Sequence, residues 1–153
     1  MPGAPFSVRL RPIAAALLLA LLTSTACTSE DSPTAAQAGQ TLKKHVLQLL
    51  DEAGARDVAI TDPGGKDIPC ADGGVKQTFA VTAGDIDDDR QPQFIKDELV
   101  GALRRVARYQ MISDGFDAGP VEVRDATSGS VLQLGAPAKG RIAISGWTGC
   151  LRQ

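Results

Sequence analysis

The densest group of oxygen donors in the chain consists of four neighbouring aspartates, Asp85, Asp87, Asp88 and Asp89. Carboxylates at alternate positions are typical of the start of a calcium-binding loop. The rest of such a loop is missing, because Arg90 stands where its sharp turn needs glycine and Lys96 stands where a closing glutamate should bind the ion. We therefore expect these aspartates to mark the start of a helix, and we predict neither a metal site nor a cofactor.

The residues of a hydrolytic or phosphate-binding centre are present only in part. His45 is the single histidine, and no G-x-S-x-G pattern presents a serine for it to activate, so we expect His45 on an exposed helix surface. The segment Gly64–Lys66 is similar to a phosphate loop, but Asp67 replaces the residue that holds magnesium and Ile60 replaces the first glycine, which leaves a turn. Because no set of nucleophile, acid and base stands out, the chain is predicted not to be an enzyme.

Four residues are candidates for a binding surface: Arg104, Arg105, Arg108 and Trp147. The three arginines form a small basic group that suits an anionic envelope polymer or a lipid head group, although a solvated helix face gives the same pattern. Trp147 is the single tryptophan and stands close to Cys150. It either lines a binding surface or packs against a disulfide at that cysteine.

Composition limits the class of protein and its partners. The chain has 153 residues, of which 43% are hydrophobic and 22% charged, as in a single globular domain; this excludes a disordered or fibrous chain. Lys and Arg total 16 against 18 Asp and Glu, for a net charge of -2. No basic excess is present to follow a phosphate backbone, so nucleic acid is not an expected partner.

The first 26 residues have the three parts of an export signal. Met1–Pro12 carries Arg9 and Arg11 without an acid, Ile13–Leu22 contains only Ile, Ala and Leu, and small or polar residues follow from Thr23. A membrane span would need about 20 apolar residues. The shorter apolar run therefore predicts a signal peptide over residues 1–26.

Cys27 directly follows Ser24, Thr25 and Ala26, and this arrangement resembles the lipobox of bacterial lipoproteins. The family usually has Leu where this chain has Ser24, which leaves ordinary cleavage after Ala26 as an alternative. The resemblance implies lipidation of Cys27, with palmitate or a similar acyl chain. The exported protein would then be anchored to the outer face of the cell membrane.

Cys70 and Cys150 are the two remaining cysteines. An exported protein with three cysteines has one unpaired thiol unless one of them has another role, which lipidation would give to Cys27. The exported side of the membrane is oxidising, so we predict a disulfide between Cys70 and Cys150. Two buried free thiols are the alternative, and no second Cys or His stands at the spacing of a zinc site.

Two segments have apolar residues at helical spacing. Residues 27–40 are predicted to hold the lipidated cysteine and a flexible polar tether, and a single domain follows over 41–153. The first helix is expected from Thr41 to Ala53, and the later part of the tether is consistent with an earlier start. The second is expected from Gln91 to Ile112, with Asp88 and Asp89 as start signals.

Five short segments alternate apolar and polar residues as half-buried strands do. They are centred on Val58–Ile60, Phe79–Val81, Val121–Val123, Leu132–Leu134 and Ile142–Ile144. The last three are separated by turn-rich breaks, which predicts an antiparallel meander. Two one-sided helices can cover one face of such a sheet, so we predict a two-layer α+β domain with the order α-β-β-α-β-β-β.

The whole arrangement resembles small actinobacterial lipoproteins of the LppA-like kind. The resemblance depends on the lipobox, the opening helix, the mid-chain cysteine, the FIKDELVGALRRVARYQ helix and the final RIAISGWTGC strand, and it covers about Thr41 to Cys150. It implies a cell-surface α+β domain with a disulfide and no known chemistry.

These observations favour a non-enzymatic lipoprotein of the cell envelope that acts as a binding or interaction module. Its expected partners are the membrane, through the lipid anchor, and an envelope protein, polymer or lipid. The alternative is a carrier of a lipid or other hydrophobic ligand. An apolar cavity between sheet and helices would favour the carrier, whereas a solid core would favour the module.

Overall fold

The computed structural model describes residues 32–115 and 119–153. The predicted signal peptide, Cys27 and the first residues of the tether lie outside this part of the chain. The elements in chain order are α1 (Ala35–Glu52), β1 (Arg56–Asp62), β2 (Ile68–Pro69), β3 (Val75–Lys76), β4 (Thr78–Gly84), α2 (Pro92–Val106), β5 (Tyr109–Ser113), β6 (Val121–Asp125), β7 (Val131–Ala138) and β8 (Arg141–Trp147).

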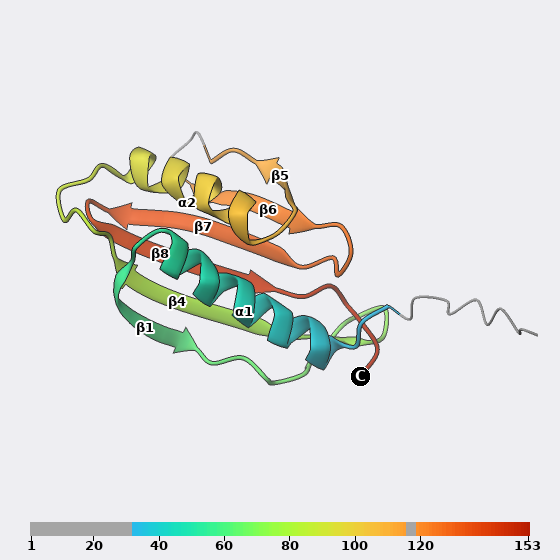
Figure 1. The fold of residues 1–153 in the computed structure, drawn as a ribbon. Coiled ribbons are helices and arrows are strands. Elements are labelled where there is room, and N and C mark those ends of the chain that lie inside the picture. The colour runs from blue at the N-terminus through green and yellow to red at the C-terminus, as the bar shows by residue number, and fades with distance from the viewer. Residues whose placement is uncertain (1–31, 116–118) are drawn as a thin grey trace, which may run out of the picture. The chain divides into compact units, whose positions relative to one another are not determined.

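Six strands form one antiparallel sheet in the order β1-β4-β8-β7-β6-β5, and β2 and β3 form a separate small hairpin. Both helices lie on the same face of the sheet, α1 over β4 and β8 and α2 over β7 (Figure 1). The predicted two-layer α+β fold is therefore confirmed. The predicted meander is confirmed as β6, β7 and β8, and the sheet has one strand more than we expected.

The alternation of the inner strands explains why one face is covered. Every second residue of these strands points toward the helices, and the helices supply matching apolar stripes. The side chains that meet there are at most 4% exposed: Leu42, Val46, Leu49, Phe79, Val81, Ala83, Ile95, Leu99, Leu103, Leu132, Leu134, Ile142 and Ile144. The layer between helices and sheet is thus a packed apolar core.

Helix α1 begins six residues earlier than Thr41. Thr34 and Gln37 form a capping box, in which the Gln37 amide donates to Thr34 Oγ1 at 3.3 Å and the Thr34 amide donates to Gln37 Oε1 at 2.9 Å. Ala35 and Ala38 are 0% and 1% exposed, so the predicted tether extends too far. Its last residues belong to the packed domain because the cap starts the helix upstream of the apolar stripe.

Helix α2 ends at Val106, and the predicted extension to Ile112 is wrong. Ala107 has an extended backbone, with φ -160° and ψ 170°, and Tyr109–Ser113 forms the edge strand β5 beside β6. Aromatic and β-branched residues such as Tyr109 and Ile112 favour a strand where a free sheet edge offers backbone partners. In the part of the chain that the structure describes, no helix is long and apolar enough to cross a membrane.

Candidate binding sites

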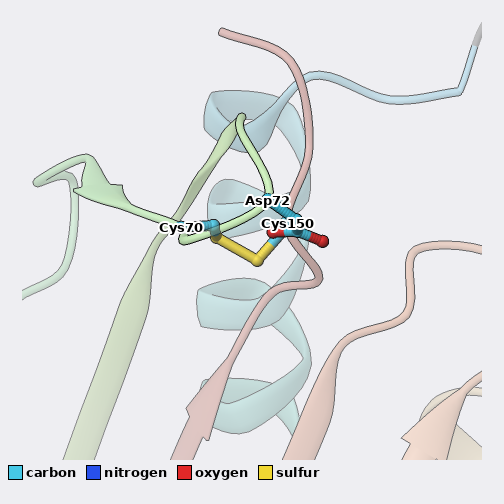
Figure 2. Close-up of side chains that lie close together, drawn as sticks. All are labelled: Cys70, Asp72 and Cys150. Atoms are coloured by element: carbon cyan, nitrogen blue, oxygen red, sulfur yellow. A yellow bond between two sulfur atoms is a disulfide. The ribbon is translucent and has the colours of Figure 1, made fainter.

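Cys70 and Cys150 form the predicted disulfide, which joins two positions whose Cα atoms are 6.1 Å apart (Figure 2). The carboxylate of Asp72 lies close to both sulfur atoms. A metal would need free thiolates, and here the two sulfurs are bonded to each other. The cluster is therefore a covalent cross-link and not a metal centre.

The disulfide closes a region that backbone hydrogen bonds already hold. Val75 and Leu151 exchange two such bonds, at 2.8 and 2.9 Å, and the Ala35 amide donates to Arg152 O at 2.8 Å. The backbone N–H of Gln77, a residue that is 6% exposed, donates to Thr148 Oγ1 at 3.0 Å. The start of α1, the β2–β3 hairpin and the C-terminal residues thus meet at one place, where the cross-link has a structural role.

The acidic cluster is organised by arginines. Asp85 is 1% exposed and its Oδ2 lies 3.1 Å from Arg90 Nε. Arg56 donates to the backbone oxygen of Asp85 at 2.7 and 3.1 Å, and its Nη2 lies 3.3 Å from Asp88 Oδ1. The expected role at the helix start is wrong, because Gln91 is the N-cap of α2 and makes no side-chain cap. The guanidinium groups of Arg90 and Arg56 thus compensate the charges of the Asp85 and Asp88 carboxylates.

The three candidate arginines have different surroundings. Arg105 Nε donates to Glu52 Oε2 at 2.8 Å and so joins α2 to α1. Arg104 is exposed beside a crevice of about 80 Å³ between α2 and β5. Arg108 follows the end of α2, is exposed, and lines a different and larger pocket. Only Arg108 therefore combines an exposed guanidinium with a pocket large enough for a small ligand.

Trp147 lies on the face of the sheet that the helices leave uncovered. It is partly exposed and stands in register with Thr78 on β4 and Val131 on β7. Its neighbour Gly146 points the opposite way, since a Cβ there would lie 2.7 Å from a methyl carbon of Leu132 and 3.1 Å from one of Leu42. The candidate tryptophan and the candidate arginines thus belong to different surfaces.

The same uncovered face has a groove of about 410 Å³, here called the sheet groove. Ala80, Ala143 and Gly135 occupy neighbouring strands at its centre, and their small side chains leave the hollow. None of its lining residues is charged: Thr61, Ala80, Val81, Thr82, Gly119, Pro120, Gln133, Gly135, Ala136, Pro137, Ala143, Ile144 and Ser145. The composition of this lining could not be anticipated, because it unites strands far apart in the chain.

A ladder of hydrogen bonds orders the polar groups at one side of the sheet groove. Ser145 Oγ donates to Gln133 Oε1 at 3.2 Å, and Gln133 Nε2 donates to Glu122 Oε1 at 2.7 Å. The ladder crosses β8, β7 and β6. Gln133 is thereby held in one orientation, with its amide bonded on both sides.

A second pocket, of about 380 Å³, is lined by basic, acidic, aromatic and hydroxyl side chains and is here called the His45 pocket. It is lined by His45, Ala107, Arg108, Tyr109, Gln110, Asp125, Ala126 and Thr127. His45 Nδ1 lies 3.1 Å from the Tyr109 hydroxyl, and the two rings meet edge to face with centroids 5.8 Å apart. His45 is therefore half-buried, and the expectation of an exposed surface histidine is wrong.

Burial and one nearby carboxylate set the charge of this pair. Desolvation lowers the pKa of His45 below 6.5, while Asp125 opposes that shift and Lys44 adds to it. Desolvation, with a smaller contribution from Asp125, raises the pKa of Tyr109 above 10.0. Both rings are therefore neutral at pH 7. A sequence signal existed, since His45 stands three residues after Leu42 and borders the apolar stripe of the helix.

Both pockets offer shape and hydrogen-bonding groups to a ligand. None of the protein-family models, curated proteins or solved structures compared with this chain matches it.

Proposed function

We propose that this protein is a non-enzymatic lipoprotein of the cell envelope, loosely of the LppA-like kind, whose α+β domain binds an extended uncharged ligand in the sheet groove. The lipid on Cys27 holds the domain at the outer face of the cell membrane. A neutral glycan chain of the envelope has the chemistry that the groove favours.

One observation carries the proposal: a groove without a charged lining residue on the face of the sheet that no helix covers. An uncharged lining gives no Coulomb attraction to a charged polymer, and a charge placed there would lose hydration without a partner. The hydroxyl and amide groups of Thr82, Ser145 and Gln133 suit the hydroxyls of a sugar. Trp147, on the same face, has the flat apolar ring on which a sugar ring packs.

The alternative function, a carrier of a hydrophobic ligand, has less support. It needs an apolar cavity between sheet and helices, and the side chains that fill this layer are at most 4% exposed. The His45 pocket opens at the border of that layer, and its lining includes the charged residues Arg108 and Asp125.

The binding proposal is tested by titrating the purified full chain with a series of neutral oligosaccharides, a polyanionic polysaccharide and lipid vesicles. Thr82→Arg places volume and charge in the groove at an exposed position, and we expect it to weaken neutral-sugar binding by at least about tenfold. Ser113→Arg is the matched control, since Ser113 is exposed on β5 outside the groove. Binding of the polyanion alone, or extraction of lipid from the vesicles, would overturn the proposal.

The anchor is tested separately. A diacylglyceryl group on Cys27 would supply two acyl chains, enough for stable membrane association. We expect Cys27→Ala to move the protein out of the membrane fraction or to leave its precursor uncleaved, as judged by fractionation and intact mass. A variant that matured and fractionated like the unmodified chain would contradict lipidation and leave the groove experiment unaffected.

A further inference from the structure

The His45 pocket contains one fixed negative charge. The Asp125 carboxylate accepts the Thr127 amide on Oδ1 at 3.0 Å and the Ser128 hydroxyl on Oδ2 at 2.7 Å. These bonds orient the carboxylate, and each oxygen keeps a second lone pair for a further donor. Asp125 thus combines a turn-forming role with an acceptor that lines the pocket.

The same pocket contains one positive charge that Asp125 does not neutralise. Arg108 is exposed and lines the pocket, yet the ion pairs between described residues include neither Arg108 nor Asp125. A basic and an acidic residue therefore line one pocket without forming an ion pair with each other. A simple anion would be repelled by Asp125, and a simple cation by Arg108.

The His45–Tyr109 pair adds a neutral hydrogen-bond donor. A neutral imidazole has one N–H and a phenol has one O–H, and only one of these two hydrogens is used in the 3.1 Å contact. If the phenol donates to Nδ1, the Nε2–H remains; if Nδ1–H donates to the phenol oxygen, the O–H remains. In either tautomer one donor is left over from the contact, on a residue that lines the same pocket as Arg108.

We propose that the His45 pocket binds a small zwitterion, with its carboxylate or phosphate on Arg108 and its ammonium group on Asp125. The remaining donor of the His45–Tyr109 pair bonds to the anionic group. The pocket volume of about 380 Å³ suits a small molecule. An amino acid and an aminoalcohol phosphate both have this chemistry, and the site is separate from the sheet groove.

The charge requirement is tested by titrating the full chain with four probes: alanine, phosphoethanolamine, propionate and ethylamine. Propionate lacks the ammonium group of alanine, and ethylamine lacks its carboxylate. We expect one or both zwitterions to bind at least about tenfold more tightly than propionate and ethylamine. Preference between the zwitterions distinguishes an amino acid from a phosphate headgroup. Equal binding of propionate and alanine, or no binding of either zwitterion, would overturn the proposal.

Substitutions of the lining residues test whether the zwitterion binds in the His45 pocket. Arg108→Ala removes an exposed side chain and should weaken zwitterion binding about tenfold or more. The affinity of this variant for alanine should then equal its affinity for ethylamine. Asp125→Asn removes the negative charge with little change in shape, and this variant should bind propionate and alanine with equal affinity. Arg104→Ala is the matched control, because Arg104 is exposed near the end of α2, four residues before Arg108, and lines the other crevice. An Arg108→Ala protein with unchanged zwitterion affinity would contradict the assignment.

Discussion

The two edges of the sheet are built in the same way (Figure 1). Along the chain, a helix is followed by an edge strand and then by the inner strand that pairs with it: α1, β1 and β4 at one edge, and α2, β5 and β6 at the other. The connections from edge strand to inner strand are held differently. Between β1 and β4 the chain forms the β2–β3 hairpin, which the Cys70–Cys150 disulfide joins to the C-terminal residues. Between β5 and β6, Lys96 Nζ donates to Gly115 O at 2.9 Å and to Gly119 O at 3.2 Å.

The β1–β4 connection and the β5–β6 connection are thus stabilised by two different mechanisms. A disulfide acts largely by restricting the unfolded chain, so Cys150 can be exposed without loss of its effect. Lys96 acts in the folded state, where its side chain is 5% exposed and its ammonium group replaces water around two backbone oxygens. The disulfide therefore requires oxidising conditions, whereas the lysine contact depends on packing.

The largest expected effect is loss of the covalent connection. Cys70→Ser or Cys150→Ser should lower the free energy of unfolding by about 2 to 4 kcal/mol, because the unfolded chain gains freedom. The melting temperature should fall by roughly 10 °C. A reducing agent should destabilise the unmodified chain to the same extent and leave the Cys70→Ser variant unchanged. Free thiols at Cys70 and Cys150 in denatured, non-reduced protein would refute the disulfide.

Loss of the lysine contact should have a somewhat smaller effect. Lys96→Met keeps most of the apolar stem but removes the donor to Gly115 O and Gly119 O, so we expect about 1 to 3 kcal/mol of destabilisation in urea unfolding. Lys44→Met, at an exposed position on α1, is the control. If Lys96→Met matched the stability of the unmodified chain, the cost of burying the ammonium group would equal the free energy gained from its two hydrogen bonds. The statement that Lys96 stabilises the β5–β6 connection would then be wrong.

The smallest effect concerns the His45–Tyr109 contact, which joins α1 to β5. Because the pKa of His45 is lowered from 6.5, the unfolded chain binds its proton more readily, and stability should fall as the pH drops below about 6.5. Because the pKa of Tyr109 is raised from 10.0, the unfolded chain loses its proton first, and stability should fall as the pH rises above about 10.

Urea unfolding across this pH range tests the contact. His45→Gln should flatten the acid limb near pH 6, and Tyr109→Phe should flatten the alkaline limb. Gln48→Ala serves as the control, because Gln48 is an exposed and uncharged residue on the same helix as His45. If both variants kept the pH dependence of the unmodified chain at acid and alkaline pH, the titration of this pair would make no contribution to stability.

Local patterns predicted most of the fold. The apolar stripe of α1, the alternation of β4, β6, β7 and β8, and the turn-rich breaks of the meander are confirmed because each element shows its buried side at its own period. The errors lie where local signals are weak or shared. Tyr109–Ser113 continues a helical run of apolar residues, and only the free edge of β6 makes it a strand.

The sequence by itself determined the two-layer fold, because the period of the apolar residues can be read without knowing which segments meet. It predicted the Cys70–Cys150 disulfide on the premise that Cys27 has another role, and the structure confirms that bond. Only the tertiary structure decided the sites. His45 and Tyr109 are 64 positions apart, and the sheet groove joins residues of β1, β4, β7 and β8. Such contacts depend on strand order and helix placement, which are set by the packing of the whole core and leave no pattern in any single segment.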